Sequence, residues 1–227
     1  MKKLVIFDCD GVLIDSEIIY HKVGAREMTQ LGFPLTVERS IELFSGVADE
    51  KAAEIIQKEY GKTIGKNDFE MILKRVKDSF PTDLKPVANI LQVINYLNQQ
   101  EIAKCIASNS DYEYIIKVLT LVNMETNFNP KYIFSASMVG QCKPAPDLFL
   151  YAAKQMGFKP EDCLVIEDSQ VGIQAALAAN MQVISFLGGE HAKNDWYKKC
   201  VEAYNIPVAN NSEELLHNIT NLLLDNS

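Results

Sequence analysis

Two aspartates directly follow the first apolar segment of the chain. Residues 4–7 are continuously apolar, which is typical of a strand buried on both faces of a parallel sheet. Asp8, Asp10 and Gly11 come next, and the region beyond the carboxyl end of a strand is where such sheets bind ligands. Two carboxylates this close repel each other unless a cation or a shared proton relieves them, and Mg²⁺ prefers such oxygen ligands. An acidic turn without function is the alternative at this point.

Two later segments place other polar side chains in similar positions. The apolar stretch 102–107 ends in Ser108 and Asn109, whose hydroxyl and amide can contact a phosphoryl oxygen or begin the next helix. Lys143 stands in the sequence KPAP, where two prolines restrict the backbone around it. A constrained lysine is a suitable counter-charge for a phosphate, although most surface lysines are only solvated.

A second pair of acids follows another apolar segment. Residues 164–166 are apolar, and Glu167 and Asp168 come directly after them, before an expected helix start. Acids at the first turn of a helix are favoured by its dipole alone. Because paired acids occur at two separate strand ends, they are harder to dismiss as two turns without function.

These four segments, in this order and at these intervals, resemble the signature motifs of the haloacid dehalogenase-like hydrolase superfamily. The matching sequences are DCDGVLIDSE at 8–17, SN at 108–109, KPAP at 143–146 and IEDSQVGIQAA at 166–176. Within the superfamily, the chain is similar to the branch with a helical cap inserted after the first motif. That branch contains β-phosphoglucomutase and small sugar-phosphate phosphatases.

The resemblance implies a role for each matching residue. Asp8 is expected to be the nucleophile that forms an aspartyl-phosphate, and Asp10 the general acid and base. Mg²⁺ is expected to bind side chains or backbone of four acids, namely Asp8, Asp10, Glu167 and Asp168. The transferring phosphoryl group is expected to contact Ser108, Asn109 and Lys143.

The order of apolar and amphipathic segments predicts an α/β fold, a Rossmann-like parallel sheet with helices on both faces. Strands are expected near residues 3–7, 103–107, 132–134, 163–167 and 182–186. Helices are expected near 87–99, 111–121, 146–156, 170–179 and 212–224. Together, residues 1–14 and 86–227 would form this core domain.

Residues 15–85 are expected to form a small inserted helical cap domain. Amphipathic stretches occur near 16–31, 36–43, 48–59 and 67–79, and residues 80–86 contain two prolines and are expected to be the return linker. A cap on two linkers can close over the site and exclude water. Three of its residues are candidates for substrate contacts, namely Glu17, Gly46 and Asp49.

The resemblance also bears on the type of reaction. The cap loop of β-phosphoglucomutase carries an arginine where this chain has Asp49. An arginine suits the second phosphate of a bisphosphate intermediate, which an aspartate would repel. We therefore expect hydrolysis of a phosphosugar or phosphosugar acid. A phosphomutase is the alternative, and a non-catalytic binding protein on the same fold is a more distant one.

Composition restricts the partners. The formal net charge is −8, which disfavours nucleic acid, and no apolar run reaches the roughly 18 residues of a membrane helix. The five cysteines include no C-x-x-C pair, so we expect a reduced cytoplasmic protein without disulfides or zinc. We also expect a monomer that acts on a small phosphorylated metabolite.

The remaining histidines and aromatics lie outside the motifs. His191 and His217 are expected to be surface residues and not ligands. Trp196 and Tyr197 are expected to cover the edge of the core.

Overall fold

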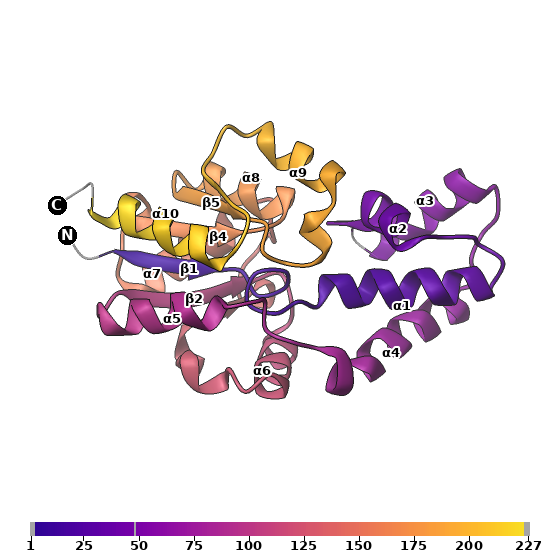
Figure 1. Cartoon of the computed structure of the whole chain (residues 1–227), viewed down its shortest axis with the longest axis horizontal. Helices are drawn as coiled ribbons and strands as arrows, with labels where there is room; N and C mark the ends of the chain where they lie inside the picture. The colour runs from indigo at the N-terminus through magenta and orange to yellow at the C-terminus, as the bar shows by residue number, and fades with distance from the viewer. Residues whose placement is uncertain (1–2, 48, 225–227) are drawn as a thin grey trace.

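Six parallel strands form the centre of the molecule. A computed structural model of the chain describes residues 3–47 and 49–224, except the side chains of residues 49, 50 and 224. The strand order is β3-β2-β1-β4-β5-β6, and Figure 1 shows the sheet with helices on both sides. The strands are β1 (Leu4–Phe7), β2 (Ala103–Ser108), β3 (Ile133–Ser135), β4 (Cys163–Glu167), β5 (Gln182–Phe186) and β6 (Val208–Ala209). The expected α/β fold is confirmed.

The helices of the core cover both faces of the sheet. They are α5 (Ile90–Gln99), α6 (Tyr112–Leu121), α7 (Asp147–Met156), α8 (Gln170–Ala178), α9 (Asp195–Glu202) and α10 (Ser212–Leu224). Helices α5 and α10 pack together in front of the sheet in Figure 1, and α7 and α8 pack together behind it. In the described part of the chain, no helix is long and apolar enough to cross a membrane.

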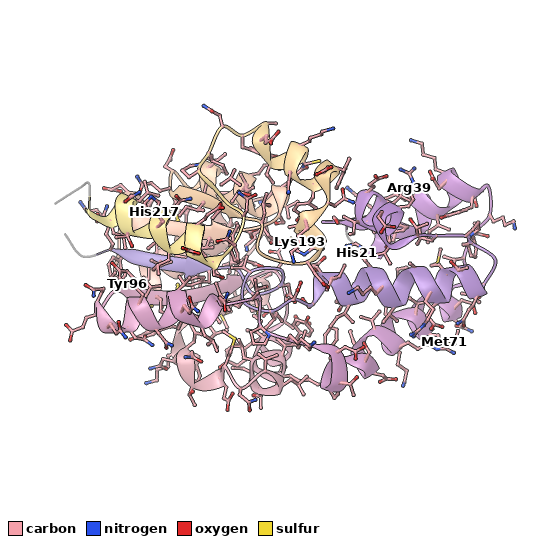
Figure 2. The ribbon with its side chains drawn as sticks, in the orientation of Figure 1. His21, Arg39, Met71, Tyr96, Lys193 and His217 are labelled. Atoms are coloured by element: carbon pink, nitrogen blue, oxygen red, sulfur yellow. The ribbon has the colours of Figure 1, made fainter. Side chains whose placement is uncertain are left out.

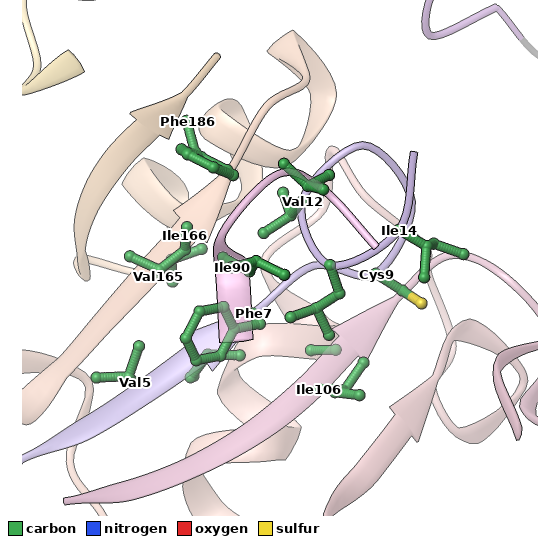
Figure 3. Packing of buried hydrophobic residues seen from close by; sticks show 14 of the residues in the cluster. Val5, Phe7, Cys9, Val12, Ile14, Ile90, Ile106, Val165, Ile166 and Phe186 are labelled. Atoms are coloured by element: carbon green, nitrogen blue, oxygen red, sulfur yellow. The ribbon is translucent and has the colours of Figure 1, made fainter. Parts of the chain in front are cut away.

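Strand β1 lies between β2 and β4, where the strand order reverses direction. Its four side chains are fully buried, as Figure 3 shows for Val5 and Phe7 beside Ile106 and Ile166 of the neighbouring strands. Apolar burial on both faces fixes the register of a central strand. The residues after β1 therefore leave the sheet from a rigid base, at the position where open α/β sheets bind ligands.

Four helices between residues 17 and 83 extend from one end of the core, on the right in Figure 1. They are α1 (Glu17–Gln30), α2 (Val37–Phe44), α3 (Asp49–Tyr60) and α4 (Lys66–Asp83). Helix α1 packs along α4 and α2. These helices have an apolar cluster of their own, made of Ala25, Met28, Phe33, Leu35, Ile56 and Ile72. Their inner ends join the main core cluster through residues such as Ile18 and Phe80.

The prediction that residues 80–86 form a linker was wrong for its first part. Helix α4 continues through Pro81 to Asp83. Proline removes one intrahelical hydrogen bond and its ring crowds the preceding turn, so this last turn of α4 must be stabilised by packing. Phe80 is 3% exposed and packs edge-on against Tyr20, with 5.8 Å between ring centroids, and this packing favours the extra turn.

Two short elements were also missed. Helix α9 buries only Tyr197 and Val201 and spans eight residues, which is shorter than the window of about 11–18 residues over which helical periodicity is judged. Strand β6 has two residues, which is fewer than any alternation pattern requires.

The core cluster generates a stability prediction. Leu97 on α5 is fully buried, whereas Leu177 on α8 is 43% exposed. Leu97→Ala should lower the free energy of unfolding by about 2–5 kcal/mol, because a cavity remains in packed surroundings. Leu177→Ala is the matched control and should change it by less than about 0.5 kcal/mol. Urea titrations of both variants measure this, and equal effects would contradict the described packing.

Candidate active site

A buried lysine lies between two carboxylates at the carboxyl end of the sheet. Lys143 Nζ is 2.6 Å from Asp8 Oδ1 and 2.7 Å from Glu167 Oε1. All three residues are buried, so each charge is paired where water cannot solvate it. Burial by itself lowers the pKa of Lys143, but the two carboxylates outweigh it and raise that pKa, so the lysine stays charged. Burial raises the pKa of Asp8, and Lys143 opposes the rise.

The backbone of Lys143 is held by the residue expected to assist phosphate binding. The Asn109 side chain accepts a hydrogen bond from Lys143 N at 3.0 Å and donates one to Lys143 O at 3.2 Å. Ser108 is buried at the end of β2, and its Oγ accepts a hydrogen bond from Ser110 N at 3.1 Å. The structure therefore brings Ser108 and Asn109 to the lysine segment, and the contact of Asn109 is with protein backbone.

Three hydroxyl groups surround the carboxylate of Asp10. Ser16 Oγ and Tyr114 Oη donate to Oδ1 at 2.6 and 2.8 Å, and Ser110 Oγ donates to Oδ2 at 2.8 Å. Ser16 directly precedes α1, whereas Ser110 and Tyr114 belong to the segment that follows β2. Sequence reasoning did not assign Tyr114 to the site, because nothing in its spacing indicates contact with a residue 104 positions away.

The prediction that His191 is a surface residue was wrong. Its side chain is fully buried, and its Nε2 is 2.8 Å from Asp168 Oδ2. Tyr197 Oη lies 3.5 Å from the same oxygen, and its ring meets His191 edge-on with 5.0 Å between centroids. Burial lowers the pKa of His191, which favours the neutral ring. His217, by contrast, is exposed on α10, as expected (Figure 2).

Two glycines make room for this arrangement. A Cβ on Gly11, whose φ is +79°, would lie 2.1 Å from Asp168 Oδ2. A Cβ on Gly189 would lie 2.8 Å from the His191 ring. The pair Gly188-Gly189, one residue beyond the end of β5 and followed so soon by a histidine, is the signal that could have identified His191 from sequence.

The carboxylates differ in how well they suit a metal ion. Glu167 has both oxygens engaged, since Oε1 contacts Lys143 and Oε2 accepts from Ser169 N and Oγ, both at 2.9 Å. The side-chain contacts of Asp8 and Asp168 involve Oδ1 and Oδ2 respectively, and the second oxygen of each suits a hard cation. Among the described residues, no three His, Cys, Asp or Glu side chains form a ready-made metal cluster. The donor set therefore fits a cation that also takes backbone carbonyl, water or substrate oxygens, as Mg²⁺ does.

A pocket of about 490 Å³ opens beside Asp10, a size typical of small-molecule sites. Its wall on the core side includes Asn109, Ser110 and Tyr114, and its other wall comes from α1, α2, α3 and α4. Glu17 and Gly46, two of the expected cap contacts, line it. The third, Asp49, has a side chain outside the described part of the structure.

Two titratable groups in the pocket wall are strongly perturbed. Burial raises the pKa of Glu17 to about 7, with His191 opposing the rise and Asp10 and Asp168 adding to it. Burial lowers the pKa of His21 to about 3. His21, labelled on α1 in Figure 2, lies 3.0 Å from Ser40 Oγ and 3.3 Å from Ser45 Oγ. His21 is therefore a neutral hydrogen-bonding group at neutral pH.

Comparison with known proteins places the chain in a family. A family model described as haloacid dehalogenase-like hydrolase matches residues 5–186. The chain belongs to the haloacid dehalogenase-like hydrolase family, and the resemblance stated from its motifs is confirmed.

Individual relatives add detail. The chain is similar to 6-phosphogluconate phosphatase of Escherichia coli strain K12, with 28% identity over 190 residues, which cover 83% of this chain and 84% of the relative. It is 26% identical over 184 residues to a fructose-1-phosphate phosphatase of the same organism, covering 79% of this chain and 94% of the relative. A solved structure of a haloacid dehalogenase-like protein of unknown function from Agrobacterium tumefaciens matches with a TM-score of 0.88 and 32% identity, covering 98% of this chain and 100% of that one.

The pKa of Glu17 generates a prediction about stability and pH. Because the folded-state pKa is raised from 4.5 to about 7, the folded protein binds more protons at Glu17 than the unfolded chain does in this interval. The contribution of Glu17 to the free energy of unfolding therefore falls as the pH rises from 4.5 to 7. In EDTA, Glu17→Gln should remove this fall, so it should gain stability relative to the wild type across that window.

Chemical denaturation at several pH values gives the difference between variant and wild type. Glu54→Gln, on the exposed side of α3, is the matched control for the loss of one carboxylate. A difference between Glu17→Gln and wild type that does not vary with pH would show that Glu17 is not perturbed by its surroundings.

Proposed function

We propose that this protein is a Mg²⁺-dependent phosphatase that hydrolyses a small phosphorylated metabolite, a phosphosugar or phosphosugar acid, through an aspartyl-phosphate on Asp8. The observation that carries the proposal is the pairing of Asp8 with Lys143 at 2.6 Å, at the carboxyl end of the central strand. A carboxylate can act as nucleophile where a cation neutralises the phosphoryl oxygens that it approaches. The named activities of the two Escherichia coli relatives support this substrate class.

The geometry supports a two-step reaction. In the first step, an oxygen of Asp8 attacks phosphorus, the bond to the ester oxygen breaks, and Asp10 gives its proton to the departing alcohol. In the second step, Asp10 takes a proton from water as the water attacks the aspartyl-phosphate, which releases inorganic phosphate and restores Asp8. The hydroxyls around Asp10 can donate or accept hydrogen bonds, so they hold its carboxyl group in both protonation states.

Asp8, Asp168 and the backbone carbonyl of Asp10 would hold Mg²⁺, with water and substrate completing its oxygen shell. When bound, the cation neutralises developing charge on the phosphoryl oxygens. Glu167, which was expected to be a ligand, is assigned a different role, because both of its oxygens are engaged by Lys143 and Ser169. We assign Glu167 to positioning Lys143.

We propose that residues 15–85 act as a cap over the core formed by 1–14 and 86–227. The two connecting segments run side by side, since Asp15 N donates to Lys85 O at 2.9 Å and Val87 N donates to Leu13 O at 3.0 Å. Adjacent entry and exit segments form a natural hinge. We further propose a cytoplasmic monomer, and the five free cysteines agree with a reducing compartment.

The pocket favours hydrolysis over phosphoryl transfer between two positions of a sugar. A mutase must hold a second phosphate under the cap, for which arginine is the usual residue. Among the described residues that line the pocket, Lys77 is the one lysine and no arginine occurs. Arg39 pairs with Glu42 and Glu59 and does not line the pocket. It lies on α2, as Figure 2 shows.

The nucleophile and the metal can be tested together. Asp8→Asn should lower phosphate release from any accepted phosphomonoester by about three orders of magnitude or more, because an amide does not attack phosphorus. Asp83→Asn, exposed at the end of α4, is the control and should retain activity. EDTA should silence the wild type and Mg²⁺ should restore it. Full activity of Asp8→Asn would contradict the assigned nucleophile, and full activity in EDTA would contradict the metal.

The reaction type has its own test. The enzyme is incubated with β-glucose 1-phosphate, Mg²⁺ and a trace of the 1,6-bisphosphate, and both glucose 6-phosphate and free phosphate are measured. We expect free phosphate to form faster, since no arginine is among the described residues that line the pocket. Faster formation of glucose 6-phosphate would make the protein a phosphomutase.

A further inference from the structure

The pocket beside Asp10 has two halves with different chemistry. The half nearest the sheet is polar and contains Asp10, Glu17, Asn109 and Ser110. The half inside the cap is mostly apolar, and its lining includes Phe44, Val47, Phe69 and Leu73. A ligand that fills this pocket must therefore change character along its length.

The apolar half includes side chains that protein packing leaves partly uncovered. Phe44, Val47, Phe69 and Leu73 are half-buried, unlike the fully packed residues behind them. Phe69 and Leu73 are one turn apart on α4, so they lie on one face of that helix. Phe44 ends α2 and Val47 follows it. When an apolar group of a ligand covers partly exposed apolar side chains in one concave wall, apolar surface is removed from water and binding is favoured.

The charged groups of the pocket do not favour a second anionic group on the ligand. Lys77 is the one lysine among the described lining residues, and its side chain is exposed to solvent. His21 is neutral at neutral pH, because burial lowers its pKa to about 3. Asp111 lines the same pocket and would repel a second anionic group, as would Glu17 in the fraction of molecules in which it is ionised.

We propose that the substrate is a sugar phosphate whose far end carries an uncharged apolar or aromatic substituent, which lies against Phe44, Phe69 and Leu73. The hydroxyl groups of the sugar lie in the polar half, and the phosphate lies past Asp10 toward Asp8 and Lys143, which do not themselves line this pocket. This inference rests on the proposed phosphatase activity and narrows its substrate class. Within the proposed class it ranks substituted phosphosugars above unsubstituted ones, and both above phosphosugar acids.

Three substrates with the phosphate on the same carbon test the inference. They are glucose 6-phosphate, phenyl β-glucoside 6-phosphate and 6-phosphogluconate, which end in a hydroxyl, an aromatic ring and a carboxylate. We expect kcat/KM for the phenyl glucoside to exceed that for glucose 6-phosphate by about tenfold or more, which corresponds to about 1.4 kcal/mol. We expect 6-phosphogluconate to be the poorest of the three.

Variants locate the source of the preference. Phe69→Ser should reduce the ratio of kcat/KM between the phenyl glucoside and glucose 6-phosphate by about tenfold, whereas Phe69→Leu, which keeps an apolar surface, should preserve most of it. Tyr132→Ser is the control, because Tyr132 is 40% exposed and does not line the pocket. A ratio that is the same in wild type and Phe69→Ser would overturn the assigned contact.

Acetyl phosphate separates failure of this inference from failure of the proposed function, because its leaving group is too small to reach the cap. Hydrolysis of acetyl phosphate together with equal or better use of glucose 6-phosphate or 6-phosphogluconate would overturn the inference and leave the phosphatase intact. No hydrolysis of any of the four compounds would overturn the proposed function and this inference with it.

Discussion

The contact of Lys143 with Asp8 and Glu167 is the interaction on which the arrangement of the site depends. Loss of the ammonium would leave two buried carboxylates without their shared counter-charge, and breaking a buried ion pair typically costs about 3–5 kcal/mol. Further contacts hold the lysine and its two carboxylate partners in place. Asn109 holds the lysine backbone, Ser169 holds the far oxygen of Glu167, and the pairing of β1 with β4 sets their spacing. The proposed nucleophile is thus positioned by the sheet itself.

The second carboxylate of the first motif is positioned in a different way. Asp10 receives hydrogen bonds from Ser110 and Tyr114 of the core and from Ser16 at the start of α1. The orientation of Asp10 therefore depends both on the core and on Ser16, which directly precedes α1. In the proposed reaction, Asp10 first gives a proton to the leaving oxygen and then takes one from the attacking water. Hydroxyl groups suit both stages, because they can donate to a carboxylate and accept from a carboxylic acid.

The sheet and the motif residues could be predicted from sequence because their signals are local. An apolar run such as 4–7 and the acids that follow it are adjacent in the chain, and parallel strands bring their ends together in any sheet of this class. The partners of those residues could not be predicted in the same way. His191 reaches Asp168, and Asn109 reaches the backbone of Lys143, through tertiary packing alone. Because of Pro81, the sequence predicted an end of α4 that is too early. The burial of Phe80 outweighed the local preference of proline against a helix.

The loop after β5 joins two parts of the molecule that are far apart in sequence. Glu190 N donates to Asp15 at 3.0 Å, and its carboxylate lies 2.8 Å from Lys22 on α1. The next residue, His191, contacts Asp168. Adjacent residues of one short segment thus contact the start of the helical insertion and the deeply buried carboxylate of Asp168. Because these contacts are made by adjacent residues, a displacement of α1 relative to the sheet would strain both of them.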